Sequence, residues 1–230
     1  MPIMKKGVFD VTDEKNMPIK KEDGKFVKKA EAVISVFDRG FIFGDGIYEV
    51  VPVIHGKLID KDYFLERLTR SLHELSIQWP YSKQEYIEMM ETLIEKNALR
   101  EGIVYSQVTR GPADRDFPFP KNAKPGVVAF TSVMAILNNP DFETGIAVIT
   151  TPDIRWKRRD IKSINLLGQV LAKQEAVSKN SKEAWMVEDG LITEGASSSA
   201  YIVNNNVPVS YTHLRAHETR GNLVCRLLLE

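Results

Sequence analysis

Apolar residues recur every three or four positions in two consecutive stretches of the chain, which is the spacing of a helix with one buried face. The first stretch begins near Asp62, and its apolar positions are Phe64, Leu65, Leu68, Leu72 and Leu75. The second has Tyr86, Met90, Leu93 and Ile94 at the same spacing. Ser82 and Glu85 form the capping-box pattern of a helix start just before it. We therefore predict two amphipathic helices in succession, and a third over about residues 166–178.

Short apolar runs bounded by glycine and proline predict strands between these helices. The runs are Val33–Phe37, Ile103–Thr109, Val127–Val133 and Ile146–Thr151. The pairs His55-Gly56 and Asp189-Gly190 are typical of hairpin turns. Residues 1–60 are expected to form short strands and turns. Because strands and helices do not alternate regularly, the pattern favours an α+β fold.

The segment GPADRDFPFPKNAKPG at 111–126 is rich in proline, glycine and charge. Such a segment is a candidate both for a domain boundary and for a functional loop. We expect a small N-terminal α+β domain over 1–120 and the first part of a larger domain over 121–208.

Charge and composition point to a small-molecule partner. Lys plus Arg and Asp plus Glu each total 31, so no net field favours nucleic acid or an anionic membrane. No apolar run is long enough to span a membrane, and the N-terminus has no secretory h-region. The single cysteine, Cys225, excludes a disulfide framework, so a cytoplasmic location is expected. Phosphate-loop, dinucleotide and nucleophile-elbow motifs are missing from the sequence.

Three segments contain distinctive sequence motifs. They are FDRGFIFGDGIYEV with FLERL, DIRWKRRDIKSINLLGQVLAKQEA, and GLITEGASSSAYIV. In order and spacing they resemble the fold-type IV aminotransferases, which depend on pyridoxal 5′-phosphate. The resemblance is strongest to the D-amino acid aminotransferases and extends to about Asn206. It implies a two-domain fold with the cofactor between the domains, and a homodimer.

Lys162 is the central candidate. A lysine before a helix is most often a solvated charge. Here Arg155, Lys157, Arg158 and Arg159 precede it, and crowded positive charge favours the neutral amine that Schiff-base formation needs. The resemblance implies that Lys162 binds the cofactor aldehyde and moves the proton between the substrate Cα and the cofactor C4′.

The resemblance also assigns cofactor-binding residues. Glu194 would face the pyridine nitrogen and keep it protonated, and Arg67 would bind the phosphate through its planar guanidinium. Ser197 and Ser198 would donate hydroxyl groups near the phosphate. Tyr48 would flank both the cofactor and the substrate.

Arg115 and Arg110 are the candidates for the substrate α-carboxylate. In D-amino acid aminotransferases the pattern is close to RGxxxRxHxFP, and here it reads RGPADRDFPFP. Arg115 matches the carboxylate-binding arginine, whereas Phe117 replaces its histidine companion. A site with one donor fewer should bind a carboxylate more weakly or differently.

The resemblance stops after Asn206. The tail 209–230 is similar to a translated sequencing-library adapter, which would give Val209–Thr219 and Leu223–Glu230. We expect it to be non-native, so His213, His217 and Cys225 carry no functional weight. Resequencing the gene beyond Asn206 would contradict this if the tail were recovered from genomic DNA.

These features predict amino-group transfer from a D-amino acid such as D-alanine to a 2-oxo acid such as 2-oxoglutarate. A branched-chain L-amino acid aminotransferase and an aminodeoxychorismate lyase are alternatives on the same scaffold. The alternative that involves no enzymatic activity is that the chain is an inactive, truncated fragment. No metal site, nucleic acid or membrane is expected.

Overall fold

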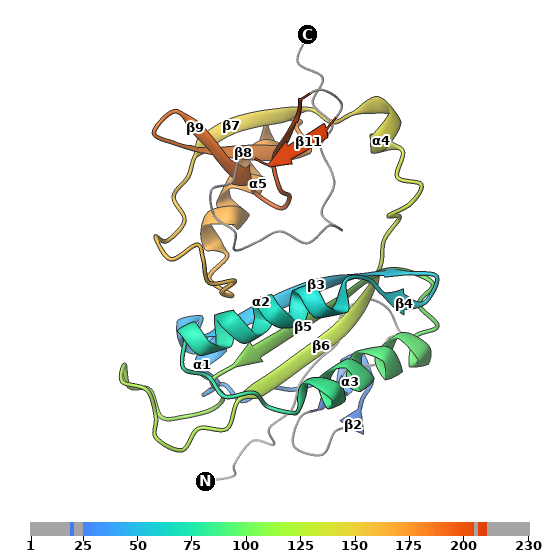
Figure 1. Cartoon of the computed structure of the whole chain (residues 1–230). Coiled ribbons are helices and arrows are strands. Elements are labelled where there is room, and N and C mark those ends of the chain that lie inside the picture. The colour runs from blue at the N-terminus through green and yellow to red at the C-terminus, as the bar shows by residue number, and fades with distance from the viewer. Residues whose placement is uncertain (1–18, 21–24, 205–206, 211–230) are drawn as a thin grey trace. The chain divides into compact units, whose positions relative to one another are not determined.

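The computed structural model describes residues 19–20, 25–204 and 207–210. The chain divides into two compact units, and each is described by itself (Figure 1). Unit 1 comprises the described residues up to Ile136 together with Ile161–Ile164, and unit 2 comprises Leu137–Asp160 and the described residues from Asn165 onward. None of the helices in the described part is both long and apolar enough to cross a bilayer.

Unit 1 is built on a four-stranded antiparallel sheet in the order β4-β3-β5-β6. Along β3 and β5, side chains alternate between the two faces of the sheet, because successive residues of a strand point to opposite sides. The expected hairpin turn at His55-Gly56 is confirmed, with φ of 53° and 75° between β3 and β4. The strands are β3 (Gly46–Ile54), β4 (Lys57–Leu58), β5 (Glu101–Thr109) and β6 (Gly126–Val133).

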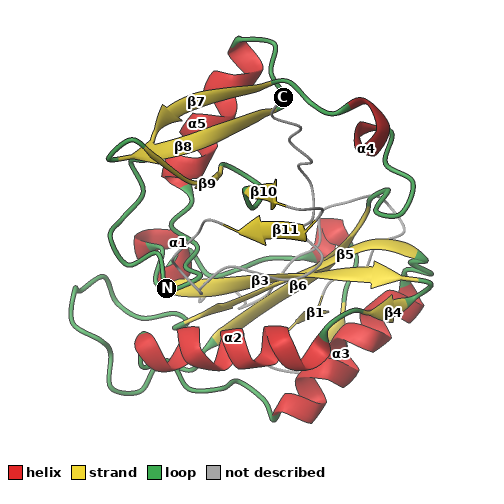
Figure 2. Cartoon of the chain, turned by 45° about the horizontal axis from the view of Figure 1, so that its top comes forward, coloured by secondary structure: helices red, strands yellow, loops and turns green. Residues whose placement is uncertain are grey.

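Both predicted helices of unit 1 are confirmed, as α2 (Lys61–Glu74) and α3 (Lys83–Lys96). They cover one face of the sheet (Figure 2). The capping box is present, since Ser82 and Glu85 exchange hydrogen bonds at the start of α3. The apolar stripes of the two helices and one face of the sheet form a single buried core. Its members include Phe64, Leu68, Leu72, Tyr86, Met90, Leu93, Ile47, Val51, Val104, Val108 and Val127.

The predicted strand Val33–Phe37 is wrong. Residues 32–35 have no regular structure, and residues 36–37 form a turn in which the Asp38 amide donates to the Ser35 carbonyl at 2.9 Å. Its apolar side chains are largely exposed, so no neighbouring strand or core stabilises an extended run there. A short helix follows instead, α1 (Arg39–Phe43), with the Asp38 side chain as its N-cap. The minor elements before it are β1 (Ile19–Lys20), β2 (Lys25–Phe26) and the 3₁₀ turn η1 (Lys29–Glu31).

Unit 2 contains a three-stranded sheet in the order β7-β8-β9. Strands β7 and β8 are parallel, and the predicted third helix, confirmed as α5, connects them and packs on β8. The hairpin at Asp189-Gly190 is also confirmed, with both residues at positive φ. The elements are α4 (Asp141–Thr144), β7 (Val148–Pro152), α5 (Leu167–Ser178), β8 (Glu183–Glu188), β9 (Leu191–Gly195), β10 (Tyr201–Asn204) and β11 (Val207–Ser210).

The expected domain boundary at residue 120 needs correction. The 111–126 segment connects β5 to β6 of the same sheet, so unit 1 continues to Ile136. The proline and glycine residues belong to a long loop between two paired strands. Such a loop has the same composition as a linker between domains, so the sequence alone does not distinguish the two. Of the predicted non-native tail, residues 211–230 lie outside the described residues.

Candidate active site

The segment around Lys162 belongs to unit 1 because it pairs with the first residues of β3. The Tyr48 amide donates to the Lys162 carbonyl at 3.0 Å, and the Ile164 amide donates to the Gly46 carbonyl at 3.1 Å. Gly46 permits close contact with β5 and with Ile164, since a Cβ there would lie 2.7 Å from the Val108 carbonyl oxygen and 3.1 Å from the Ile164 side chain. The backbone therefore fixes Lys162 against the edge of the sheet.

The Lys162 side chain is buried, with only 7% of the residue exposed. Its Nζ lies 3.4 Å from the Tyr48 hydroxyl and 4.4 Å from the centre of the Tyr48 ring. No carboxylate among the described residues is within ion-pair distance of Nζ. A buried amine without a counter-ion is costly as a structural feature, so this placement favours a chemical role.

Arg67 lies on the buried side of α2 beside Glu49 of β3, which is fully buried. Arg67 Nε donates to Glu49 Oε1 at 2.7 Å, and Nη2 donates to Glu49 Oε2. This side-on pairing uses one edge of the guanidinium. The buried Nη1 has no hydrogen-bond partner among the described residues. A buried cation with an unpaired donor is suited to bind an anionic group.

The face of the sheet opposite the helices carries a row of aromatic rings. Tyr48, Tyr105 and Phe130 come from three adjacent strands, and their ring centres are 5.7 and 4.7 Å apart in nearly parallel stacks. The Tyr105 hydroxyl donates to Gln107 Oε1 at 2.8 Å. Burial raises the pKa of Tyr105, and the nearby Tyr48 raises it further. The Tyr105 hydroxyl therefore stays protonated at neutral pH. Lys162 thus lies beside a flat aromatic surface.

In unit 2, Glu194 lies on β9 and accepts a hydrogen bond from Arg155 Nη1. The other edge of Arg155 binds Asp153, with Nε and Nη2 at 3.0 and 2.8 Å from its carboxylate oxygens. Thr193, beside Glu194, donates its hydroxyl to Asp153 Oδ2 at 2.7 Å. Burial alone would raise the pKa of Asp153, but the hydrogen bonds from Arg155 and Thr193 hold it at about 2. This network holds Glu194 in place through Arg155.

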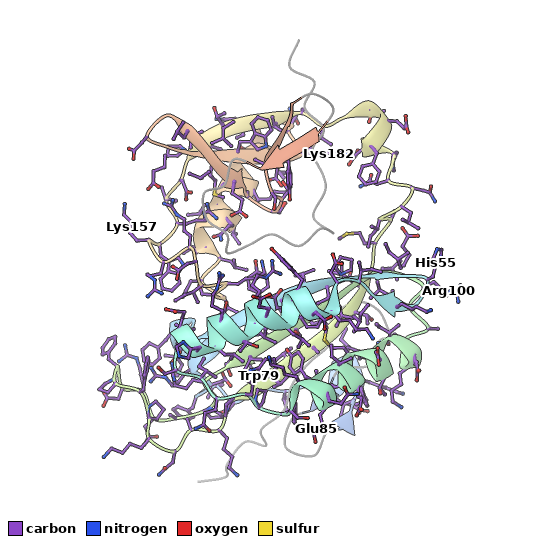
Figure 3. The ribbon with its side chains drawn as sticks, in the orientation of Figure 1. His55, Trp79, Glu85, Arg100, Lys157 and Lys182 are labelled. Carbon is purple, nitrogen blue, oxygen red and sulfur yellow. The ribbon has the colours of Figure 1, made fainter. Side chains whose placement is uncertain are left out.

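The interpretation of the cationic run before Lys162 needs correction. Arg155 is neutralised by Asp153 and Glu194, Arg158 pairs with Asp160, and Arg159 makes a bidentate pair with Glu188 at 2.5 and 2.8 Å. Lys157 extends into solvent with 92% of its side chain exposed (Figure 3). The positive charge is cancelled by Asp153 and Asp160, which flank the run, and by Glu188 and Glu194 on β8 and β9, so the run does not act as a net cation.

Ser197 and Ser198 follow β9, and both bind Glu183 of β8. The Ser197 hydroxyl lies 2.7 Å and the Ser198 hydroxyl 2.9 Å from Glu183 Oε2. A hydroxyl has one proton to donate, so neither serine directs it at another anion in this arrangement. Donation to a phosphate stays a prediction, and it requires a hydroxyl to leave Glu183.

The two candidates for binding the substrate carboxylate, Arg110 and Arg115, differ in exposure and in hydrogen bonding. Arg110 is 6% exposed and binds Asp45 through Nε and Nη2 at 2.7 and 3.0 Å. Its remaining donors reach the Ser76 and Leu75 carbonyls at 3.2 and 2.6 Å. Arg115, by contrast, is exposed on the β5–β6 loop. The hydrogen bonds of Arg110 leave it engaged within the fold, so Arg115 is the remaining candidate for binding the substrate carboxylate.

Sequence reasoning missed the carboxylates that hold these groups, namely Glu49, Asp153 and Glu183. Asp153 precedes Arg155 by two residues, and this short Asp-x-Arg spacing was a usable signal. Glu49 follows Tyr48, but its arginine partner is 18 residues away. Glu183 contacts serines 14 and 15 residues away, and nothing in the local pattern indicates that contact.

Comparison with known proteins bears on this arrangement. The family model "Amino-transferase class IV" matches residues 46–210. D-alanine aminotransferase from Staphylococcus aureus is 43% identical over 194 residues, which cover 83% of this chain and 67% of the relative. The Bacillus licheniformis D-alanine aminotransferase is 38% identical over 193 residues, covering 83% and 66%.

Solved structures share the fold. The branched-chain amino acid aminotransferase of Escherichia coli has a TM-score of 0.74 at 17% identity, covering 85% of this chain and 67% of that one. The 4-amino-4-deoxychorismate lyase of Pseudomonas aeruginosa has a TM-score of 0.62 at 26% identity, covering 78% and 66%.

The fold is therefore that of the fold-type IV aminotransferases, as the sequence predicted. The chain belongs to the class IV aminotransferase family.

Proposed function

We propose that this chain transfers an amino group between a D-amino acid, such as D-alanine, and a 2-oxo acid, such as 2-oxoglutarate, with pyridoxal 5′-phosphate as cofactor. The observation that carries the proposal is the buried, counter-ion-free Lys162 amine beside Tyr48. The D-alanine aminotransferases at 43% identity support the choice of donor.

The residues of unit 1 fit this cofactor. The cofactor aldehyde needs an amine that is not held in an ion pair, and Lys162 Nζ meets that condition among the described residues. The phosphate dianion needs a cationic donor, and Arg67 Nη1 is buried without a described partner. The cofactor supplies a reactive aldehyde and a ring that takes up electrons from the substrate Cα.

Each remaining residue has a defined task. Lys162 Nζ carries the proton at the substrate Cα, and the Tyr48 hydroxyl lies within hydrogen-bond distance to orient it. In unit 2, Glu194 would keep the pyridine nitrogen protonated, and Arg155 holds the Glu194 side chain in position. Ser197 and Ser198 are proposed phosphate donors, subject to release from Glu183.

Arg115 would hold the substrate α-carboxylate. The structure gives its guanidinium no hydrogen bond or ion pair to any residue that it describes. The homodimer rests on the resemblance alone and the cytoplasmic location on cysteine usage, and both stay predictions.

Substrate choice tests the proposal directly. We expect the 230-residue chain, loaded with pyridoxal 5′-phosphate, to convert 2-oxoglutarate to glutamate faster with D-alanine than with L-leucine. Initial rates measured with each donor at equal concentration provide the comparison. Faster turnover of L-leucine would favour the branched-chain alternative. Cofactor binding without turnover of either donor would contradict the proposed activity.

Phe117 offers a second test, because it replaces a hydrogen-bond donor with an apolar ring. We expect Phe117→His to lower KM for D-alanine by about 2- to 12-fold, the effect of one added hydrogen bond. Phe142→His, on the exposed helix α4, serves as a control for histidine substitution as such. An unchanged or higher KM in Phe117→His would mean that position 117 does not contact the carboxylate.

A further inference from the structure

Asp45 is a nearly buried carboxylate that joins two buried arginines. Arg39 Nε and Arg110 Nε both lie 2.7 Å from Asp45 Oδ2, and Arg110 Nη2 lies 3.0 Å from Oδ1. The exposed fractions of the three side chains are 10% for Asp45, 4% for Arg39 and 7% for Arg110. We call these three residues the Asp45 clamp.

The arginines use their other donors on the β5–β6 loop and its surroundings. Arg39 Nη1 donates to the Asp116 carbonyl at 2.5 Å, and Nη2 donates to the Phe117 carbonyl at 3.3 Å. The Phe119 ring lies over the Arg110 guanidinium, with 3.6 Å from Cζ to the ring centre. The clamp therefore holds the loop at the two residues that follow Arg115 and again at Phe119.

Besides the clamp, the described contacts of this part of the loop include the Phe43 and Phe117 rings, whose centres lie 5.6 Å apart. Residues 113–125 contain no helix or strand, and Phe117 and Phe119 are 74% and 57% exposed. Arg115 itself makes ring contacts with Phe43 and Phe117, each 5.6 Å from Cζ. Because the side chain has no described hydrogen bond, its position depends on these ring contacts and on the backbone that Arg39 holds.

We propose that Arg39 and Asp45 are positioning residues, which order the loop so that Arg115 is presented to the substrate carboxylate. This inference rests on the role given to Arg115 under the proposed function. A loop that adopts the competent conformation only part of the time binds its ligand more weakly in proportion to that fraction. The clamp raises that fraction before substrate arrives. Its loss should therefore affect substrate binding more than the chemical step.

Arg39→Lys tests the clamp because it keeps the charge beside Asp45 but cannot also reach two carbonyls. The first measurement is limited trypsin digestion of the folded chain, with the cleavage rate at Arg115 followed by mass spectrometry. The rate at Lys157 is the internal reference. We expect Arg39→Lys to accelerate cleavage at Arg115 on the order of tenfold, the effect of one lost charge-assisted hydrogen bond. Arg100→Lys, at an exposed residue immediately before β5, is the control for this substitution as such (Figure 3). An unchanged cleavage rate would overturn the proposal.

Kinetics then separate positioning from general damage. We expect Arg39→Lys to raise KM for D-alanine on the order of tenfold while kcat changes less than about threefold. This effect should disappear in an Arg115→Gln background, because both changes act through the same contact. Additive effects, or a loss confined to kcat, would contradict the inference. If Arg115→Gln alone leaves KM unchanged, the proposed substrate role of Arg115 fails, whereas the cleavage rates still decide whether the clamp orders the loop.

Discussion

Replacing Lys162 with alanine is expected to lower transamination by at least roughly 100- to 10,000-fold, the contribution of a positioned acid–base group. The physical reason is the loss of both the amine that binds the cofactor aldehyde and the group that carries the Cα proton. Borohydride reduction of the loaded chain, followed by peptide mapping, should place the cofactor label on Lys162. The same treatment of Lys162→Ala should leave that peptide unlabelled.

Lys157→Ala is the matched control for this experiment. Lys157 belongs to the same cationic run, but its side chain is 92% exposed, so its loss should leave labelling and turnover unchanged. Labelling of another lysine in the unmodified chain, or normal turnover by Lys162→Ala, would contradict the assignment. The comparison separates a specific buried amine from the general reactivity of surface lysines.

The helices of unit 1 could be predicted because their signal is local. Phe64, Leu68 and Leu72 repeat with the period of the helix that buries them, and Ser82 caps the next helix through a residue three positions away. The run Val33–Phe37 had equally strong apolar character and formed no strand. A strand needs a partner, and the sequence does not say whether one is adjacent.

The sequence could name candidate reactive groups, but it could not name the residues that hold them. Lys162, Arg67 and Glu194 stand in distinctive motifs, so the sequence identifies them by resemblance. Arg110 and Arg115 occur in one motif, and only the fold distinguishes a buried scaffold arginine from an exposed one. The partner of Arg110 is Asp45, 65 residues away, and such pairings are set by the sheet register.

The second large effect is a loss of folding stability when Glu49 is replaced. Glu49→Ala removes the carboxylate that neutralises buried Arg67 and leaves an uncompensated charge in the core. Breaking a buried ion pair in this way costs about 3–5 kcal/mol in the free energy of unfolding. Urea denaturation of the variant and the unmodified chain measures this difference. A variant as stable as the unmodified chain would contradict the structural role of the pair.

The cofactor should partly reverse this loss. With Glu49 absent, the phosphate of pyridoxal 5′-phosphate becomes a counter-ion for Arg67, and any ligand that binds the folded state raises its stability. We therefore expect saturating cofactor to raise Tm more in Glu49→Ala than in the unmodified chain. Equal shifts would mean that the phosphate does not contact Arg67.

A double variant separates folding from cofactor binding. Replacing a buried ion pair with apolar residues of similar size is often neutral or stabilising, so Glu49→Leu with Arg67→Met should recover most of the lost stability. It should nevertheless bind pyridoxal 5′-phosphate about 10- to 100-fold more weakly, because hydrogen bonds to the charged phosphate are missing. A cofactor titration followed by absorbance measures this affinity. If the folded double variant bound the cofactor as tightly as the unmodified chain, Arg67 would have only a structural role, and the unpaired Nη1 would need another explanation.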